Sequence, residues 1–194
     1  IGSSAENVGL RSPQTETLLG NPLTYYGKAK LMASKYLFKK KNNSLKFFVF
    51  RLYQVYGPNQ DINRFLPILF SACLDKKIFN CSDGKQVRDF LFIDDLIAAF
   101  FAAFRNQSVN KRSIINIGSG KGIKLKAIIE KTIKLLKGKK PNYGAVKLRK
   151  DEQMVIYPNI NKSHSLLKWR PKVSFAQGLL KTIDFYKKKK NKNL

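Results

Sequence analysis

Tyr26 and Lys30 have the residue types and the spacing of an acid/base pair. On a helix, residues four positions apart lie on the same face, so an ammonium at one position can lie close to a phenol at the other. A free phenol has a pKa of about 10, and a neighbouring cation lowers the pKa of a phenol toward the range useful for proton transfer at neutral pH. The pair therefore predicts a tyrosine that acts as a general acid/base. The spacing alone also occurs on lysine-rich helices, where it has no catalytic role.

A serine-rich segment just upstream, Gly2-Ser3-Ser4-Ala5-Glu6, favours the catalytic interpretation. A hydroxyl such as that of Ser4 can hydrogen-bond the substrate oxygen that the tyrosine deprotonates. It would hold this oxygen while a hydride leaves or arrives at the adjacent carbon.

The elements that must position these residues alternate between helices and strands. Apolar residues at helical spacing predict a helix over 22–41, with Tyr26 and Lys30 in its first turns. The apolar run 47–52 predicts a buried parallel strand that delivers Gln54, Tyr56 and Gly57 to a loop beyond its carboxyl end, where α/β sheets bind ligands.

The rest of the chain continues the alternation. The pattern predicts short strands over 77–81 and 114–117, and helices over 64–76, 96–104, 124–137, 163–167 and 175–186. Asp94 and Asp95 are placed to cap the helix that starts at 96. Such alternation predicts an α/β fold.

Six motifs follow one another along nearly the whole chain. They are Ser3-Ser4, Tyr26-Gly27-Lys28-Ala29-Lys30, Arg51-Leu52-Tyr53-Gln54-Val55-Tyr56-Gly57-Pro58, Gly84-Lys85-Gln86-Val87-Arg88-Asp89-Phe90, Asn116-Ile117-Gly118-Ser119-Gly120 and Trp169-Arg170-Pro171. In this order they resemble the extended short-chain dehydrogenase/reductases that act on nucleotide sugars. The ordered set is far more specific than any one motif.

The resemblance implies an α/β fold made of the C-terminal part of a Rossmann-like, doubly wound parallel sheet and a small mixed α/β substrate-binding lobe. Residues 1–60 would end the NAD(P)-binding domain and carry the Tyr/Lys helix. Residues 61–186 would form mainly the nucleotide-sugar lobe, with some segments returning to the sheet, and 187–194 a basic tail. The family's glycine-rich turn has no counterpart before Ile1, so we expect a C-terminal fragment that is inactive alone.

The resemblance also implies an NAD(P)-dependent nucleotide-sugar epimerase that acts through a 4-keto intermediate. Tyr26 would be the acid/base, and Lys30 would tune it and hold the nicotinamide ribose. Ser4, preferred to Ser3 because it lies five residues before Gly9, would orient the sugar oxygen. Tyr53 is expected beside the cofactor, which is NAD or NADP.

For the substrate, Arg88 and Arg149 resemble two arginines with which these epimerases grip the nucleotide diphosphate through parallel, charge-assisted hydrogen bonds. Glu152 matches the acidic residue that touches the ribose. Gln54 stands where the family usually has an Asn that contacts the substrate phosphate. Phe79 lies where the nucleotide-facing strand runs, and packing in the core is its competing interpretation.

The reaction type stays open between three chemistries. Dehydratases of the family carry an acidic or hydroxyl residue followed by Glu after the catalytic hydroxyl, whereas this chain has Ala5 and Glu6. Because Ala5 cannot donate a proton, an epimerase or a 4-keto-sugar reductase is favoured over a dehydratase.

The formal net charge of +26, from 38 Lys and Arg against 12 Asp and Glu, suggests an alternative function outside the enzymes. A non-catalytic basic protein that binds nucleotides or nucleic acid would also carry such charge. The lysines are spread along the chain, however, and the densest run lies at 187–190 near the end. We expect a nucleotide-diphosphate sugar as ligand, a homodimer, and neither a membrane nor a nucleic acid as partner.

Cysteine and histidine usage narrows the chemistry further. Cys73 and Cys81 are isolated, which predicts inert thiols in a reducing compartment, the cytoplasm. His164 is the only histidine, which excludes His-cluster metal chemistry, and no metal site is expected.

Overall fold

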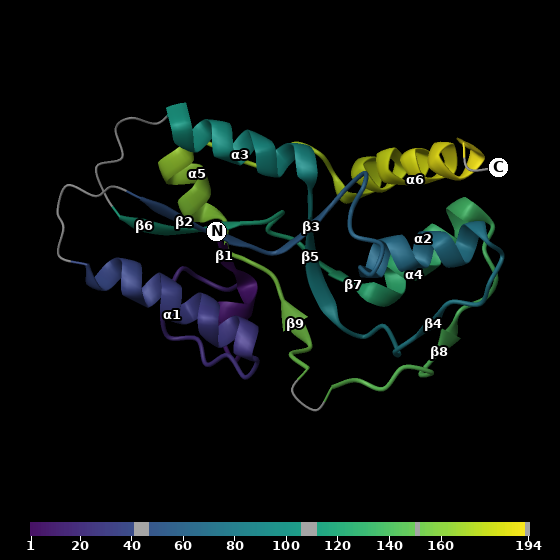
Figure 1. Cartoon of the computed structure of the whole chain (residues 1–194), viewed down its shortest axis with the longest axis horizontal. Helices are drawn as coiled ribbons and strands as arrows, with labels where there is room; N and C mark the ends of the chain where they lie inside the picture. Colours follow the sequence, from purple (N-terminus) through teal and green to yellow (C-terminus); the bar gives the residue numbers. More distant parts are fainter. Residues whose placement is uncertain (41–46, 106–111, 150–151, 193–194) are drawn as a thin grey trace.

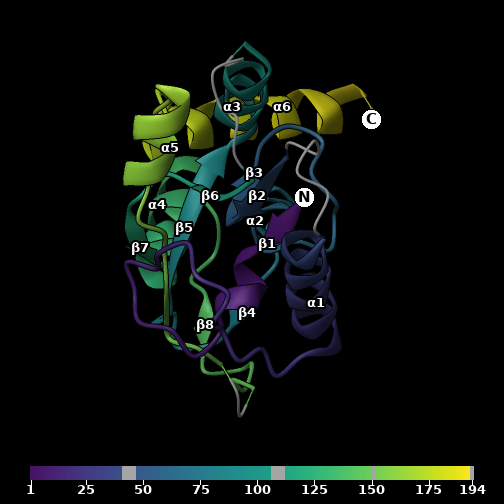
Figure 2. The ribbon, with the colours of Figure 1, turned by 90° about the vertical axis from the view of Figure 1, so that its left-hand side faces the viewer.

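One region of the protein is a parallel sheet covered by helices on both faces (Figures 1 and 2). The computed structural model describes residues 1–40, 47–105, 112–149 and 152–192. Strands β1 (Gly2–Ser3), β2 (Phe48–Leu52) and β6 (Ser113–Ile117) lie in the order β1-β2-β6 and are all parallel. Helix α1 (Tyr25–Lys39) lies on one side, and α3 (Ile93–Arg105) and α5 (Asn161–Leu167) on the other. We call these six elements the frame.

The frame explains the apolar run in β2. Its residues Val49, Phe50 and Arg51 are buried, as expected for a parallel strand with both faces covered. Phe50, together with Ile115 and Ile117 of β6, packs against residues of α3 and α5. The buried strand predicted over 47–52 is therefore confirmed.

The second region, which we call the lobe, is built on β5 (Val87–Phe92). This strand pairs in parallel with β3 (Gln54–Tyr56) and β9 (Val155–Ile156), and antiparallel with β7 (Gly122–Lys124). Beside it lie the strand pair β4 (Asn80–Cys81) and β8 (Asn142–Tyr143) and the helices α2 (Phe65–Leu74), α4 (Leu125–Leu136) and α6 (Phe175–Lys192). Together the two regions give the Rossmann-like α/β architecture that the sequence predicts.

Residues 54–56 form a strand instead of the predicted loop. Tyr53 alone separates β2 from β3, so the chain passes directly from one sheet to the next. Tyr56 is 2% exposed and packs on Phe90, Phe92 and Phe175, with ring centroids 6.1, 5.6 and 5.4 Å away. This aromatic packing holds β3 in the lobe sheet.

Two helix ends also differ from the prediction. Helix α3 begins at Ile93, so Asp95 lies inside it, and its carboxylate accepts hydrogen bonds from the backbone N–H groups of Lys172 and Val173, both at 2.9 Å. The last helix extends to Lys192, beyond the predicted end at 186, and so includes the basic run 187–190. Lys190 in this run pairs with Asp75 at 2.7 Å.

Among the helices that the structure describes, none has both the length and the apolar character needed to span a bilayer.

Candidate functional site

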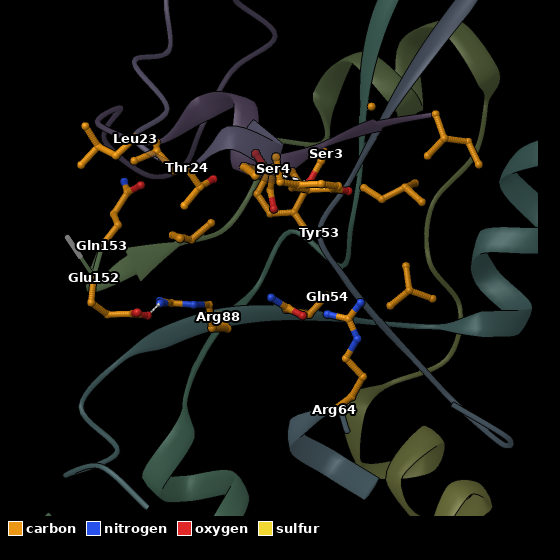
Figure 3. A pocket seen from close by; sticks show the side chains of 18 of the residues that line it. Ser3, Ser4, Leu23, Thr24, Tyr53, Gln54, Arg64, Arg88, Glu152 and Gln153 are labelled. Carbon is orange, nitrogen blue, oxygen red and sulfur yellow. Dashed lines mark hydrogen bonds and ion pairs between the residues drawn. The ribbon is translucent and has the colours of Figure 1, made fainter. Parts of the chain in front are cut away.

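A cavity of about 860 Å³ lies where the frame meets the lobe (Figure 3). Most of the residues singled out in the sequence line it: Ser4, Tyr26, Tyr53, Gln54, Arg88, Arg149 and Glu152. Lys30 and Phe79 do not line it. The fold thus brings together residues that are distant in the sequence: Ser4 and Glu152 are 148 positions apart.

The two serines have different surroundings. Ser3 caps the 3₁₀ turn Ser4–Asn7: its Oγ accepts a hydrogen bond from the Ala5 N–H at 3.2 Å, and its own N–H donates to Glu6 Oε1 at 2.8 Å. Within the described residues, the Ser4 hydroxyl has no hydrogen-bond partner, although Ser4 lines the cavity. Of the two, Ser4 therefore has the hydroxyl that is free for a ligand.

Tyr26 lies in the first turn of α1, which Thr24 caps by accepting a hydrogen bond from the Gly27 N–H at 3.1 Å. The side chain of Tyr26 is 58% exposed at the cavity. Lys30 lies one turn later, with its Nζ 5.7 Å from the centre of the Tyr26 ring. The same Nζ donates to the carbonyl of Ile1 at 3.2 Å, which ties α1 to the start of β1. The expected Tyr–Lys proximity is present, although the ammonium lies outside the cavity lining.

Tyr53 forms part of the wall but its hydroxyl faces the protein. It is 6% exposed, and its hydroxyl donates to Gln14 Oε1 at 2.9 Å. Burial raises the pKa of Tyr53 well above that of a free phenol. The residue therefore offers the cavity an aromatic surface and no acidic proton.

Arg88, Glu152 and Arg149 form a linked cluster in the cavity lining. Figure 3 shows the contact between Arg88 and Glu152. Arg88 Nη2 donates to Glu152 Oε1, and Arg149 Nε and Nη2 donate to Glu152 Oε2 at 3.2 and 3.0 Å. Arg88 Nη1 is also engaged, with the carbonyls of Val87 and Met154 at 2.8 and 3.2 Å. Burial lowers the pKa of the Arg88 guanidinium, and the neighbouring Glu152 carboxylate acts in the opposite direction.

Phe79 differs from the substrate-binding expectation. It is 7% exposed in the lobe core and packs on Phe65, with the ring centroids 6.2 Å apart. It does not line the cavity, and its position agrees with the competing interpretation, packing in the core.

Glu6 is a structural carboxylate in this structure. It is fully buried and accepts hydrogen bonds from Arg51 Nη2 at 2.9 Å and from Ser34 Oγ at 3.0 Å. Both of its oxygens are occupied, and it does not line the cavity. A role in proton transfer to a sugar is therefore not supported for Glu6.

The sequence analysis missed several polar residues of the cavity: Thr24, Gln60, Arg64 and Gln153. Gln153 links the segment before β9 to the loop that follows the 3₁₀ turn Ser4–Asn7, because its Nε2 donates to the Leu10 carbonyl at 2.6 Å and its Oε1 accepts from the Gly9 N–H at 3.4 Å. Gln60 and Arg64 lie on the loop that follows β3, and loops beyond strand ends in α/β folds are where such residues could have been sought.

The described ranges 1–40, 47–105, 112–149 and 152–192 contain no cluster of three metal-binding side chains. What the cavity does offer is a set of hydroxyls, Ser4, Thr24 and Tyr26, on the frame side and a set of arginines, Arg64, Arg88 and Arg149, on the lobe side. Hydroxyls can exchange or donate protons, and guanidinium groups bind phosphate or carboxylate. The arrangement therefore suits an anionic ligand that carries a reacting hydroxyl.

Comparisons with known proteins agree with this chemistry. Residues 1–118 match the model of the NAD dependent epimerase/dehydratase family. The CDP-abequose synthase of Salmonella typhimurium is 30% identical over 71% of this chain and 47% of its own length. The UDP-glucuronate 4-epimerase of Thermodesulfobacterium geofontis is 33% identical over 74% of this chain and 44% of its own. The chain thus spans about half the length of these curated relatives.

A solved structure shows the same architecture. The UDP-glucuronic acid 4-epimerase of Bacillus cereus, in complex with UDP-glucuronic acid and NAD, superposes with a TM-score of 0.87 at 29% identity, over 96% of this chain and 60% of that one. The match of the family model to more than half of the residues, together with this fold, shows that the chain belongs to the NAD-dependent epimerase/dehydratase family of extended short-chain dehydrogenase/reductases.

Proposed function

We propose that this chain supplies the proton-transfer and substrate-binding residues of an NAD-dependent nucleotide-sugar epimerase. The observation that carries the proposal is that one cavity is lined by Ser4, Tyr26, Arg88, Arg149 and Glu152. Hydroxyls for acid/base chemistry and arginines for a diphosphate are then within reach of one ligand.

In this proposal, Tyr26 removes the proton from the reacting hydroxyl of the sugar and later returns it. Ser4 donates a hydrogen bond to the same oxygen and fixes its direction, for which its unengaged hydroxyl is suited. Lys30, with its Nζ 5.7 Å from the Tyr26 ring centre, supplies positive charge beside the phenol.

The residues at the frame end fit a nicotinamide ribose. The Tyr26 hydroxyl is a donor for ribose oxygens, and Ile1, Leu52 and the ring of Tyr53 offer apolar surface in the same wall. Lys30 lies outside this wall, and its ammonium would exchange the Ile1 carbonyl for the ribose. NAD, when bound, supplies the hydride chemistry. We propose NAD rather than NADP because the Bacillus cereus relative described above was solved with NAD.

At the lobe end, Arg88 and Arg149 bind the diphosphate, Glu152 accepts hydrogen bonds from the ribose of the nucleotide, and the Gln54 amide contacts a phosphate. All four residues line the same cavity. We further propose a homodimer in the cytoplasm, where the free thiols of Cys73 and Cys81 would stay reduced.

Two other reactions of the family are compatible with this cavity to different degrees. A 4-keto-sugar reductase would use the same Tyr26 and Ser4. A 4,6-dehydratase would need a further proton donor, and the burial of Glu6 against Arg51 and Ser34 disfavours it.

The test is to express the complete coding sequence and incubate its product with NAD, or with the reduced cofactor, and a panel of nucleotide sugars that includes 4-keto sugars, while following nicotinamide absorbance and the product sugars. Product without net cofactor change indicates an epimerase, and stoichiometric oxidation of the reduced cofactor with a 4-keto sugar indicates a reductase. A protein that leaves all sugars unchanged and binds nucleic acid in a salt-dependent way would refute the proposal in favour of the basic binding protein.

The Tyr26→Phe variant tests the assignment of the acid/base. We expect turnover to be abolished and nucleotide-sugar binding to persist. The matched control is Tyr25→Phe, because Tyr25 is the adjacent tyrosine, is 91% exposed and does not line the cavity. A Tyr26→Phe variant that turns over as fast as this control would contradict the assignment.

A further inference from the structure

Ser4 and Tyr26 belong to separate elements, although both are assigned above to one sugar oxygen. Ser4 begins the 3₁₀ turn Ser4–Asn7, Tyr26 lies in the first turn of α1, and the segment 8–24 joins the two elements. A misplacement of about 1 Å between groups that act together can lower a rate about a hundredfold. The chemistry therefore depends on how α1 is held against the turn, which lies beside this helix in both views (Figures 1 and 2).

The first point of contact is Gly27, the residue that follows Tyr26. Gly27 is buried, and a methyl group at this position would lie 2.7 Å from the carbonyl oxygen of Ala5, well inside the distance at which such atoms pack. Because glycine has no side chain, the backbone of α1 can approach the backbone of the turn this closely. The contact lies one residue from Tyr26 on the helix and one residue from Ser4 in the turn.

The second point of contact is Ser34, which lies seven residues, or about 10 Å, further along α1. Ser34 is 3% exposed, and its Oγ donates to Glu6 Oε2 at 3.0 Å. The other oxygen of this carboxylate accepts the Ser3 N–H at 2.8 Å, and Arg51 of β2 also donates to Oε2, at 2.9 Å. The Glu6 side chain therefore joins the helix, the turn and the sheet through buried hydrogen bonds.

Two contacts about 10 Å apart fix the direction of a helix, whereas one contact does not. With Gly27 alone, α1 could pivot on the turn, and the pivot would move the Tyr26 hydroxyl relative to Ser4. The bond from Ser34 to Glu6 opposes this motion. Neither Gly27 nor Ser34 lines the cavity, so an effect of either residue on the chemistry has to act through the position of α1.

We propose that Gly27 and Ser34 are positioning residues that hold Tyr26 at its working distance from Ser4. The inference rests on the proposed function, because it assumes that the two hydroxyls act on one sugar oxygen. The nucleotide is assigned to residues of the lobe, so the binding of the substrate should depend little on Gly27 and Ser34. The effect is therefore expected in kcat and not in KM.

The experiment measures kcat and KM of the product of the complete coding sequence, with a nucleotide sugar that the wild type converts. It compares the wild type with Ser34→Ala, Gly27→Ala and a matched control, Ser163→Ala. Ser163 is a fully buried serine on α5 whose Oγ donates to the Ile160 carbonyl at 2.8 Å, and it does not line the cavity. Melting is followed by circular dichroism, and the assays are run well below the melting temperature of the least stable variant.

We expect kcat to fall about tenfold for Ser34→Ala, with KM within about twofold of the wild type. Gly27→Ala should lower kcat further, because its methyl group has to push α1 away from the Ala5 carbonyl. Ser163→Ala loses a comparable buried hydrogen bond and should keep the kcat of the wild type.

A double-mutant cycle with Ser4→Ala separates positioning from a general structural effect. Once the Ser4 hydroxyl is absent, its distance from Tyr26 no longer affects the rate. Ser34→Ala should then lower kcat by less than about threefold in the Ser4→Ala background. A general structural effect would lower kcat by the same factor with and without this hydroxyl.

The outcomes separate the inference from the proposed function. A fall in kcat for Ser34→Ala and Gly27→Ala that shrinks in the Ser4→Ala background supports the inference. If both variants turn over like the wild type, if the loss has the same size in both backgrounds, or if only KM changes, the inference is overturned and the proposed function stands. If the wild type converts none of the nucleotide sugars, the proposed function fails and the inference fails with it.

Discussion

Arginine and glutamate form ion pairs in both regions of the molecule, fully buried in the frame and at the cavity wall in the lobe. In the frame, Arg51 Nη2 lies 2.9 Å from Glu6 Oε2, and neither side chain is exposed. In the lobe, Glu152 is shared by Arg88 and Arg149 at the cavity wall, and the three side chains are 15, 10 and 71% exposed. The frame pair is closed to ligands, whereas the lobe cluster faces them.

The difference shows what burial does to an ion pair. The Nε and Nη1 groups of Arg51 have no partner within the described residues, so Glu6 is its essential neutralising group. Removing one member of such a pair leaves an uncompensated buried charge. At the cavity, solvent or an incoming anion can replace Glu152, so that cluster can rearrange at a smaller cost. The frame pair therefore contributes to stability, and we propose a binding role for the lobe cluster.

The largest effect is expected from Glu6→Gln. The change leaves the charge of Arg51 uncompensated and should lower the free energy of unfolding by about 3–5 kcal/mol, measured by urea denaturation. The double variant Glu6→Gln/Arg51→Met should recover part of this loss, because it removes the buried charge as well. A loss below about 1 kcal/mol for Glu6→Gln would place the pair in the same class as exposed ion pairs.

Glu152→Gln should have the opposite balance of effects from Glu6→Gln, with a small loss of stability and a change in anion binding. We expect a loss of stability of only about 1–2 kcal/mol, because Arg88 keeps its two carbonyl partners. Inorganic pyrophosphate should bind several-fold more tightly, since two arginines lose their competing carboxylate; calorimetry measures this. Glu130→Gln is the control, because Glu130 lies exposed on α4 and, among the described residues, its ion-pair partner is Lys126 at 4.0 Å. Weaker pyrophosphate binding by Glu152→Gln would mean that the carboxylate orients the arginines rather than competing with the anion.

Tyr53→Phe tests whether the buried hydroxyl of Tyr53, in the cavity wall, stabilises the fold. Loss of the hydrogen bond to Gln14 should cost about 1 kcal/mol at neutral pH. Because burial raises the pKa of Tyr53, the folded state keeps this proton while the unfolded state loses it above pH ~10. Wild-type stability therefore falls as the pH rises past 10, and the difference between wild type and Tyr53→Phe should shrink.

Denaturation between pH 8 and 11 measures this effect. Tyr25→Phe, which changes an exposed tyrosine, should leave the pH dependence unaltered. A difference between wild type and Tyr53→Phe that stays constant up to pH 11 would contradict the role of the buried phenol.

The smallest effect is expected from Gln54→Asn. The Gln54 side chain is exposed and has no hydrogen bond within the described residues, so stability should change by less than about 0.5 kcal/mol. Because both residues carry an amide, nucleotide-sugar affinity should change by less than about tenfold. A larger loss in titrations would show that the longer side chain is needed to reach the ligand.

Much of the fold was predictable because its signals are local. The apolar run of β2 and the helical spacing of α4 are each written in consecutive residues, and so is the Tyr26-to-Lys30 spacing. The strands β7 and β9 were missed, since each is two or three residues long and exists only by pairing with β5. Asp95 was misassigned for the same reason: its partners lie at Lys172 and Val173.

The cavity residues likewise divide into those that local sequence motifs predict and those that only the fold brings into place. Ser4 and Arg88 stand in recognisable motifs, whereas Arg64 stands in none and gains its place only because the loop after β3 returns to the cavity. Phe79, just before β4, packs in the core, and its apolar side chain alone gave no sign of which side it packs on. Burial and pairing at long range decide such positions.

The single residue between β2 and β3 limits how this chain can vary in length. Tyr53 donates its N–H to the Ile117 carbonyl at 3.3 Å and its hydroxyl to Gln14, so both ends of the junction are fixed. Side chains along a strand alternate between faces, so one inserted or deleted residue here would turn Gln54 away from the cavity and Tyr56 out of the aromatic core. Substitutions at this junction can be tolerated, but insertions and deletions are expected to be eliminated by selection.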